Sequence, residues 1–244
     1  MKLKKSIAVI TINKDCSKDL VKTIRSVDSQ DLQPSIHLIV AKKLEGTLIN
    51  KFKKKYRKFI IGKDNSLYNA MNIGLKNTWS YNIIFLNSGD IFFNNKSIFN
   101  IKKNIKVKQN CLIFKTILQF KNICYYPKKA FFCRDDYLPH PSFVRPPVSL
   151  KSNKVYFNEN KKISADSEWI KKNIEKFNFK KINIPITKHF LGGVSSDPTL
   201  YTLIIRLEES FISFIKELIK FFLKIFFGKK NFYNIIFFFK FIKK

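Results

Sequence analysis

The sequence contains no stretch of about 18 uncharged apolar residues, which is the least that a membrane-spanning helix needs. The apolar segment at residues 7–12 is too short for the core of a signal peptide, and no small-residue cleavage site follows it. These absences predict a chain without a spanning helix or a secretory leader. We therefore expect it in the cytoplasm.

Acidic residues are scarce: 17 Asp and Glu stand against 47 Lys and Arg, which gives a formal net charge of +30. Such an excess predicts contact with a polyanionic surface, either nucleic acid or anionic lipid. A second explanation is the codon bias of an AT-rich genome, because Lys, Asn, Ile and Phe are all abundant. The sequence lacks an RNA-binding aromatic motif and any zinc-finger or helix-turn-helix signature, so we do not expect a nucleic-acid partner.

The four cysteines show no CxxC pair and no spacing typical of a metal site. They are Cys16, Cys111, Cys124 and Cys133. We expect free thiols in a reducing compartment. Hydrophobic residues make up 45% of the 244 positions, which is enough for the core of one large domain or two small ones.

Apolar runs alternate with helical patterns through the first 100 residues. Strands are predicted at 6–13, 35–41, 58–62 and 81–87, and helices at 17–30, 44–56 and 65–78. Strands that are apolar on both sides and alternate with helices indicate a parallel sheet in an α/β domain. The segment up to residue 198 is less regular, with strands predicted at 111–120 and 182–190. A helix is predicted at 164–177, with Ser164 as a candidate N-cap.

One predicted strand ends abruptly in the polar segment Asn87-Ser88-Gly89-Asp90. In open parallel sheets, ligands bind beyond the carboxyl ends of the strands. Asn87 and Ser88 could hydrogen-bond a phosphate or a sugar, and Asp90 could hold a divalent cation bound to a diphosphate. The alternative is an ordinary turn, because Asn, Ser, Gly and Asp are the usual turn residues.

The segment "DNSLYNAMNIGLKNTWSYNIIFLNSGDIF" resembles the family 2 glycosyltransferases of bacterial surface-polysaccharide and lipooligosaccharide synthesis. Their pattern is close to D-x-G-I-Y-D-A-M-N-K-G, then a strand, then F-L-N-[SA]-[GD]-D. The residues that match in order are Asp64, Tyr68, Ala70, Met71, Asn72, Gly74, Phe85, Leu86, Asn87 and Asp90.

The resemblance extends over about residues 5 to 198. "ITINKDCSKDLVKTIRSVDSQ" is similar to the family's first strand and helix, with Thr11 and Asn13 in the nucleotide-facing turn and Ser26 and Gln30 at the end of the helix. "HPSFVRPP" resembles the element H-Q-[ST]-x-F-x-R, "ISADSEW" resembles A-D-[YF]-[ED], and "FLGGVSS" resembles G-G-[VI]-S.

This resemblance implies a GT-A fold, an α/β domain with a central, mostly parallel sheet. Residues 1–100 would bind the nucleotide sugar and residues 101–198 the acceptor. The implied reaction moves a hexosyl or N-acetylhexosaminyl group from a UDP-, GDP- or dTDP-sugar to a hydroxyl of a glycan or lipid-linked acceptor. It would proceed with inversion and with Mn²⁺ or Mg²⁺.

The resemblance also implies roles for single residues. Asp90 would hold the metal, and Asp166 would be the general base, with Glu168 as the second choice. For Asp166 the alternative is a carboxylate favoured by the dipole in the first turn of a helix. Arg145 would pair with a phosphate or form a surface ion pair. The residues expected to bind substrate are Thr11, Asn13, Asp64, Tyr68, Asn72, Asn87, Ser88, His140, Gly192 and Gly193.

The sequence departs from the family pattern after its second strand. Ala41 or Lys42 stands where the family has an Asp that contacts the base of the nucleotide. Lys42 and Lys43 could contact phosphate or be simply solvated, while Ser66 and Asn69 replace a Gly and an Asp of the pattern. A second hypothesis therefore remains, a non-catalytic, glycosyltransferase-like partner protein associated with the membrane.

Residues 199–244 differ in composition and contain 11 of the 26 Phe. A narrow polar stripe recurs every three or four residues, made of Glu209, Ser213, Lys216, Lys220 and Lys224. This pattern predicts a helix that ends at Gly228 and lies in the interface of an anionic membrane. We therefore expect a peripheral protein on the inner face of the cell membrane. The alternative is a helical hairpin packed on the domain or forming a homodimer.

Overall fold

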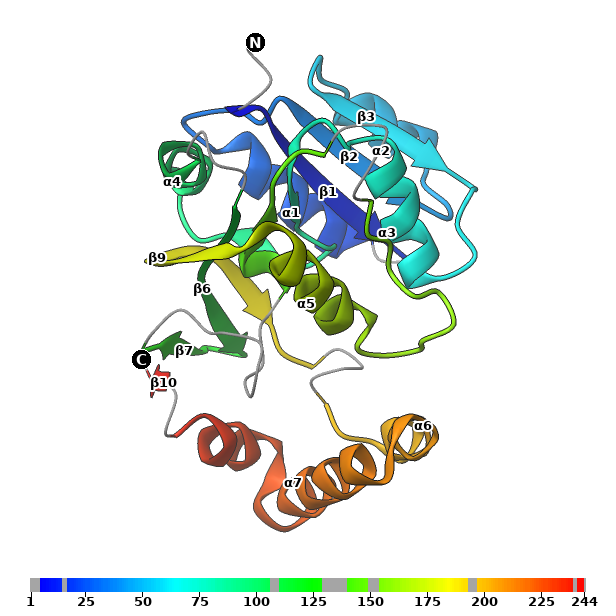
Figure 1. The fold of residues 1–244 in the computed structure, drawn as a ribbon, viewed down its shortest axis with the longest axis vertical. Coiled ribbons are helices and arrows are strands. Elements are labelled where there is room, and N and C mark those ends of the chain that lie inside the picture. Colours follow the sequence, from blue (N-terminus) through cyan, green and yellow to red (C-terminus); the bar gives the residue numbers. More distant parts are fainter. Residues whose placement is uncertain are drawn as a thin grey trace.

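The computed structural model describes residues 5–14, 17–105, 110–128, 140–148, 154–192, 197–238 and 241–243. Strands and helices alternate through the first half of the chain, and two helices follow the last long strand (Figure 1). The helices are α1 (Ser17–Asp28), α2 (Gly46–Lys51), α3 (Leu67–Lys76), α4 (Ser97–Asn104), η2 (His140–Ser142, a 3₁₀ turn), α5 (Ala165–Phe177), α6 (Leu200–Glu209) and α7 (Phe211–Phe237). The strands are β1 (Ile7–Asn13), β2 (Ile36–Ala41), β3 (Arg57–Ile61), β4 (Asn82–Phe85), β5 (Ile91–Phe92), β6 (Cys111–Phe120), β7 (Ile123–Pro127), β8 (Phe143–Arg145), β9 (Phe179–Phe190) and β10 (Phe241–Lys243).

The described strands form one mixed sheet in the order β10-β7-β6-β8-β4-β1-β2-β3, with β9 beside β6 and β5 beside β9. The four strands β3, β2, β1 and β4 are parallel, as the alternation of strands and helices predicted. Because β8 joins β4 to β6, the sheet continues without a break from the first half of the chain into the second. The α/β prediction is therefore confirmed, with both halves in one domain.

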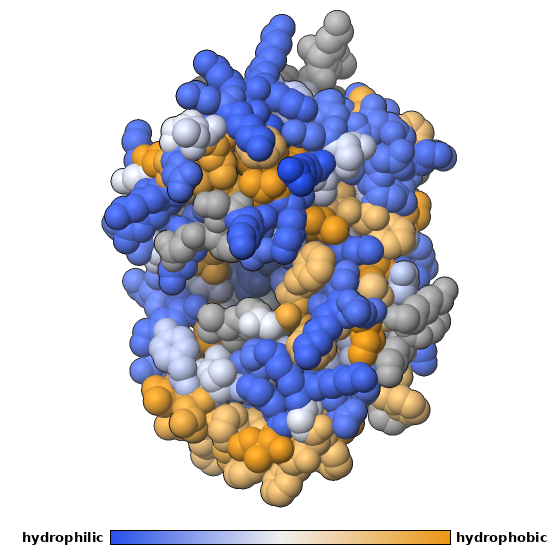
Figure 2. Space-filling view, turned by 180° about the vertical axis from the view of Figure 1, so that it is seen from behind, coloured by the Kyte–Doolittle hydropathy of each residue, from blue (hydrophilic) through white to orange (hydrophobic). Residues whose placement is uncertain are grey.

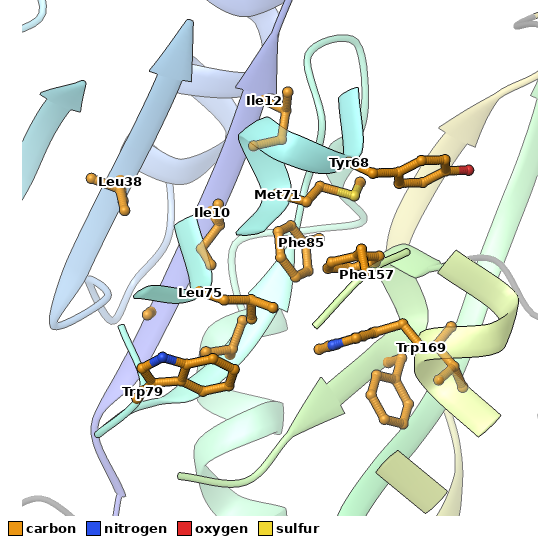
Figure 3. Close-up of a cluster of buried hydrophobic side chains, with 14 of the residues drawn as sticks. Ile10, Ile12, Leu38, Tyr68, Met71, Leu75, Trp79, Phe85, Phe157 and Trp169 are labelled. Atoms are coloured by element: carbon orange, nitrogen blue, oxygen red, sulfur yellow. The ribbon is translucent and has the colours of Figure 1, made fainter. Parts of the chain in front are cut away.

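Strand β1 is buried on both faces, and its side chains enter two different cores. Ala8, Ile10 and Ile12 pack with α3 and α5, in a cluster where Phe157 and Trp169 stack 4.7 Å apart (Figure 3). Ile7 and Val9 pack on the opposite face with α1 and α4. Since alternate residues of a strand point to opposite faces, a continuous β-branched run suits this central position.

Gly74 allows α3 to lie against β1. A Cβ atom at this position would come within 2.7 Å of the Ile10 side chain. The glycine of the "NIGLK" segment is therefore required by packing. This close contact fixes the height of α3 over the sheet, and with it the first residues of the helix, Leu67 and Tyr68.

The helices α6 and α7 form a layer of their own at one end of the molecule, beyond the carboxyl end of β9 (Figure 1). Many of their large apolar side chains are exposed, and Figure 2 shows apolar residues gathered at this pole. The most exposed are Leu200, Tyr201, Ile204, Leu207, Phe211, Ile212, Ile219, Phe222, Ile225, Phe226 and Phe227. Neither helix, nor any other in the described ranges, has the length and apolar content needed to cross a membrane.

The prediction that the tail helix ends at Gly228 is confirmed in its first part. Gly228 takes the non-helical angles φ 71° and ψ 159°, and a second helical part of α7 follows it and continues to Phe237. Its second part packs on the β6–β7 hairpin, where Phe232 and Tyr233 are buried with Phe120 and Tyr125. Helix α7 is therefore docked on the domain through the part after Gly228, while the part before Gly228 presents apolar side chains to solvent.

The other predicted helices and strands differ from the observed ones only in their first and last residues. Helix α2 is shorter than the predicted 44–56, because the segment from Lys53 to Lys55 is rich in lysine and packs no apolar face. Cys111 and Cys124 are free, as expected, whereas Cys16 and Cys133 lie outside the described residues.

The two parts of α7 predict different effects of the same substitution. Phe232→Ala should lower the free energy of unfolding by about 3 kcal/mol, because it leaves a cavity in the cluster on the β6–β7 hairpin. Phe226→Ala should change it by less than about 0.5 kcal/mol, because Phe226 is 76% exposed. Urea denaturation monitored by circular dichroism measures both. Equal effects of the two substitutions would show that the tail is not docked in this way.

Candidate active site

A cavity of about 500 Å³ lies beyond the carboxyl end of β4 and is walled by segments from distant parts of the chain. It is lined by Asp19, Leu67, Tyr68, Met71, Asn87, Ser88, Gly89, Asp90, His140, Lys162, Ile163, Asp166, His189, Phe190 and Gly192. Carboxylates and imidazoles therefore face a common space, at the end of a parallel strand where α/β proteins bind ligands.

The polar segment after β4 is a tight turn held by the neighbouring elements. The backbone N–H of Asp90 donates to the carbonyl of Asn87, and Gly89 takes φ +99°, which a glycine adopts without strain. The N–H of Ser88 donates to Ile12 of β1. From α1, the Thr23 hydroxyl donates to the carbonyl of Asp90 at 2.8 Å and accepts the N–H of Gly89 at 3.0 Å. The turn is therefore fixed before any ligand binds.

Asp90 is buried, and two imidazoles face its carboxylate. His189, near the carboxyl end of β9, hydrogen-bonds Asp90 Oδ1 at 2.7 Å. His140, which begins the turn η2, places Nε2 3.7 Å from Asp90 Oδ2. Burial by itself would lower the pKa of His189, but the Asp90 carboxylate raises it above its ordinary value. The Asp90 carboxylate thus favours the protonated form of His189, which hydrogen-bonds it.

Asp166 lies in the first turn of α5 and faces the other side of the His140 ring. Its Oδ2 is 3.7 Å from His140 Nδ1, and its Oδ1 accepts the N–H of Ser167 at 2.9 Å. Burial alone would raise the pKa of Asp166, but its interaction with His140 holds the pKa below the usual range. His140 therefore stands between two carboxylates, Asp90 and Asp166, and the second is ionised at neutral pH.

Tyr68 connects α3 with the start of α5. Its hydroxyl points away from the apolar cluster (Figure 3) and accepts the backbone N–H of Ala165 at 3.2 Å. Burial, together with the nearby charge of Asp166, raises the pKa of Tyr68, so its hydroxyl stays protonated. Tyr68 thus lines the cavity as expected, and it also supports the helix that carries Asp166.

Several buried polar atoms near the carboxyl ends of the strands have no hydrogen-bond partner among the described residues. They include Asn87 Oδ1, Ser88 Oγ, Asn13 Oδ1, Asp64 Oδ1 and His140 Nε2. An unsatisfied buried polar atom costs on the order of 1–3 kcal/mol, so a native structure seldom keeps several together without a ligand. Asn87 and Ser88 line the cavity, and their free atoms could bind the phosphates or the sugar of a donor.

Asn13 and Asp64 do not line this cavity and lie further along the same edge of the sheet. In register, Asn13 stands opposite Ala41, and Ala41 stands opposite Ile61, three residues before Asp64. The Ala41 side chain is buried, whereas Lys42 is exposed. A ligand that extends from the cavity across β1 and β2 would meet Asn13 and Asp64, and would find no carboxylate at positions 41 and 42.

Thr11 does not face a ligand. Its hydroxyl is fully buried in the sheet, where it donates to the carbonyl of Leu86 at 2.8 Å and lies 3.0 Å from His37 Nε2. Arg57 donates to the other ring nitrogen of His37 at 3.1 Å and pairs with Asp28. Burial, reinforced by the charge of Arg57, lowers the pKa of His37 to about 3. Thr11 therefore belongs to a structural network beneath the strand ends.

Asn72 supports the cavity wall and does not reach the cavity. Its amide accepts the N–H of Phe157 at 2.8 Å and donates to the Phe157 carbonyl and to Glu159. Ser26 and Gln30 have a similar role at the end of α1, because they bond the backbone at Phe92, Asn94 and Ile98. The matched motif residues thus divide into ligand-facing and structural sets.

Three further expectations are settled by position. Glu168 pairs with Lys172 at 2.6 Å and Lys161 at 3.2 Å outside the cavity lining, so it is poorly placed as a base. Arg145 is neither at a phosphate site nor in a surface ion pair, since it is buried in β8 with its guanidinium 4.8 Å from the Trp79 ring. Gly192 takes φ +119° and lines the cavity, whereas Gly193 lies outside the described residues.

Sequence analysis missed several residues of this site, and His189 and Thr23 matter most among them because they bond the Asn87–Asp90 turn. His189 closes on Asp90 across 99 positions, and no local pattern around "ITKHF" indicates that pairing. Thr23 lies on the buried face of α1, which the helical pattern predicts, but the turn that it holds is more than 60 positions away. The one available signal was the small number of histidines, since only three occur in the chain.

The donor set can be compared with the needs of a divalent cation. Within the described ranges, no three His, Cys, Asp or Glu side chains form a complete metal cluster. Mg²⁺ and Mn²⁺ do not require one, because they bind one or two carboxylates together with substrate phosphates. Asp90, beside the unpartnered oxygens of Asn87 and Ser88, fits a cation that arrives with a diphosphate.

The sequence matches no family model and no curated protein. Solved structures are similar in fold. S. aureus TarS 1-349 aligns over 83% of this chain with a TM-score of 0.63 and 17% identity, and its complex with UDP-GlcNAc gives 0.64 and 17%. The mannosyltransferase PcManGT from Pyrobaculum calidifontis, in complex with GDP-Man and Mn²⁺, aligns over 82% with a TM-score of 0.57 and 10% identity.

These similarities establish a GT-A-like fold for the chain, as the sequence resemblance implied. The chain spans 65% of TarS 1-349, 38% of a longer TarS chain and 60% of PcManGT. The neighbours therefore contain substantial regions that this chain does not match. Their substrates are properties of those proteins.

The His37 network predicts how stability depends on pH. Because the folded pKa of His37 is about 3 and the ordinary pKa is about 6.5, the unfolded state binds an extra proton between these values. The free energy of unfolding should therefore fall by about 1 kcal/mol per pH unit as the pH drops below 6.5. Urea denaturation between pH 6.5 and about 5 measures the slope, above the range in which the carboxylates with lowered pKa values titrate.

The control for this prediction is His37→Gln, which keeps a hydrogen-bonding amide but does not titrate. It should lack this slope, even if it is less stable at neutral pH. His189 does not contribute to this slope. Because its pKa is raised in the folded state, the stability that it adds is complete below about pH 6.5 and is lost only as the pH rises above that value. An unchanged slope in the variant would show that His37 is not the group responsible.

Proposed function

We propose that this protein is a glycosyltransferase that moves a sugar from a nucleotide diphosphate sugar to a hydroxyl of a glycan or lipid-linked acceptor, in surface-polysaccharide synthesis. The observation that carries the proposal is the cavity itself. It combines a fixed turn that carries unpartnered atoms of Asn87 and Ser88, the buried carboxylate Asp90, and an ionised Asp166 on the other side of His140. Sugar transfer needs groups that bind the donor phosphates close to a base that takes the proton of the acceptor hydroxyl.

The donor would lie along the strand ends. Its diphosphate would occupy the turn at Asn87–Asp90, and its nucleoside would extend across β1 and β2 toward Asn13 and Asp64, whose buried oxygens lack partners. Asp90 would hold Mn²⁺ or Mg²⁺, together with the phosphate oxygens of the donor. When bound, the cation would act as a Lewis acid that neutralises the leaving diphosphate. Gly192 would allow close approach of the backbone to the donor.

Asp166 would act as the general base. The proton of the acceptor hydroxyl would pass to its carboxylate, whose Oδ1 also accepts the Ser167 N–H and whose Oδ2 faces His140. His140, between Asp90 and Asp166, would keep this carboxylate oriented and ionised. Attack from the side of Asp166, opposite the diphosphate, would invert the configuration of the transferred sugar. A hexosyl and an N-acetylhexosaminyl group would be handled by the same residues.

The exposed layer of α6 and α7 would bind the protein to an anionic membrane. Large apolar side chains such as Ile219, Phe222 and Phe226 cover its outer surface, and a continuous exposed patch of this kind marks an interaction surface. Lys216 and Lys220 lie among them on the same helix, where they would meet anionic head groups. A peripheral position on the inner face of the cell membrane would bring the cavity to lipid-linked acceptors.

The proposed base gives a kinetic prediction. With the donor that wild type hydrolyses best among UDP-, GDP- and dTDP-sugars with Mn²⁺, Asp166→Asn should lower kcat by about a hundredfold or more, because a general base contributes that much. The KM for the donor should change little, since Asp166 faces the acceptor. Steady-state assays of donor hydrolysis and transfer measure both values.

The matched control is Asp31→Asn, which removes a surface carboxylate bonded to Asn95 and should leave kcat unchanged. If Asp166→Asn instead abolishes donor binding, Asp166 belongs to the donor site. If wild type binds donors but hydrolyses and transfers none, the protein is the non-catalytic partner that the missing Asp at 41 or 42 suggests. If it binds none, the glycosyltransferase proposal is wrong.

The membrane prediction compares exposed Phe residues at different places. The double variant Phe222→Ser, Phe226→Ser should lose most co-sedimentation with anionic phosphatidylglycerol vesicles, because the apolar face no longer inserts. Wild type should bind anionic vesicles more than neutral phosphatidylcholine vesicles, and less as salt rises.

Phe99 provides the control, since it is 49% exposed, close to the 48% of Phe222. Its helix, α4, lies away from the layer of α6 and α7 (Figure 1). Phe99→Ser should sediment like wild type. Equal losses in both variants would point to nonspecific hydrophobic adhesion. If wild type binds neither kind of vesicle, the membrane proposal is wrong, and the remaining role for the apolar surface is a dimer interface.

A further inference from the structure

The turn that precedes Asp166 has a backbone conformation that its residue does not favour. Ser164 takes φ 67° and ψ 7°, the left-handed region that non-glycine residues seldom occupy. A residue stays in this region only where its surroundings hold it there. The position of Asp166, two residues further, therefore depends on contacts made by this turn.

Ser164 does not cap α5, contrary to the expectation from the sequence. Its hydroxyl makes no capping hydrogen bond and instead accepts one from Arg206 Nη1 of α6 at 2.5 Å. Arg206 Nη1 also pairs with Glu209 Oε2 at 2.6 Å, which orients the guanidinium. Both side chains of this ion pair are about four-fifths buried, so water competes weakly with the hydrogen bond to Ser164.

The next residue is held from the other side. The backbone N–H of Ala165 donates to the Tyr68 hydroxyl, so α3 and α6 support the turn together. A second contact joins the same two segments, an ion pair between Lys162 and Glu208 at 3.4 Å. Both of its side chains are more than half exposed, and such pairs contribute little. Arg206 thus makes the stronger contact from the tail to the active-site wall.

We propose that Arg206 is a positioning residue for Asp166 and that it acts through Ser164. It does so from α6, whose other face carries the exposed side chains of Leu200, Ile204 and Leu207. The helix proposed to lie on the membrane is thereby part of the structure that orients the base. The effect of Arg206 on catalysis rests on the proposed function. The statement that Arg206 holds the Ser164 turn rests on the hydrogen bonds alone.

Hydrogen exchange measured by mass spectrometry tests the hold directly. In Arg206→Ala, a peptide covering residues 160–170 should exchange about tenfold faster than in wild type, because the Ser164 turn and the first turn of α5 open more often. Glu208→Gln is the matched control, since it removes the exposed Lys162–Glu208 ion pair between α6 and this segment, and should leave exchange unchanged. Unchanged exchange in Arg206→Ala would overturn the proposal, whatever the protein catalyses.

Kinetics test the consequence. Arg206→Ala should lower kcat for transfer about tenfold, with the KM for the donor within about twofold of wild type, since misplacing a catalytic group reduces turnover and not binding. Arg206→Lys, which can still donate to Ser164, should recover most of the lost turnover. A general loss of folding would raise exchange throughout the chain and would not be restored by lysine.

The outcomes separate this proposal from the proposed function. If exchange rises in Arg206→Ala but kcat does not change, Arg206 holds the turn without positioning a base, and the proposal is overturned. If Arg206→Ala does not fold, Arg206→Lys decides, because wild-type exchange together with near-wild-type kcat supports the hold. If wild type turns over no donor, the proposed function fails, while the exchange experiment still decides whether Arg206 holds the Ser164 turn.

Discussion

A buried carboxylate at the end of a parallel strand is the constraint around which the site is organised. Asp90 is 4% exposed, and a charge in that position is tolerated only with partners. His189 from β9 and His140 from η2 supply them. These segments come from the second half of the chain, so the need to match one charge draws the two halves together at the cavity.

The resulting chain of groups runs from His189 through Asp90 and His140 to Asp166. Each of these four residues is held by a different element of the fold, and residues that are neighbours in the site are far apart in the sequence. The elements themselves are placed by packing: Gly74 sets α3 against β1, and Tyr68 then supports the start of α5. Packing at Gly74 and Tyr68 thus determines where the ionisable residues of the site lie.

Local pattern was sufficient to predict much of this. The parallel strands followed from buried β-branched runs, and Asn87, Ser88 and Asp90 followed from a polar segment at a strand end. Tyr68, His140 and Asp166 were indicated by motif resemblance, and the structure brings all of them to one cavity. The roles given to these residues remain proposals, since the similar solved structures are too distant in sequence to transfer them.

The remaining features could not be read from local sequence, for separate physical reasons. Thr11 and Asn13 are two positions apart on one strand, yet Thr11 is covered by Leu86 and His37 while Asn13 reaches the strand end. The Ser164 hydroxyl bonds a side chain 42 positions away in preference to its own helix. In the tail, the break at Gly228 was predicted, but the second helical part of α7 was not, because it packs on a cluster of the distant β6–β7 hairpin.

The short strand β10 has a consequence for solubility. It pairs antiparallel with β7, from Phe241 opposite Pro127 to Lys243 opposite Tyr125, and so covers a strand that would otherwise present free backbone groups at the border of the sheet. Exposed strand borders recruit other chains and promote aggregation, and a border only three residues long offers little template. Removal of these few residues would uncover β7 beside the apolar layer of the tail. The border of the sheet is therefore protected by a segment that takes no part in the cavity.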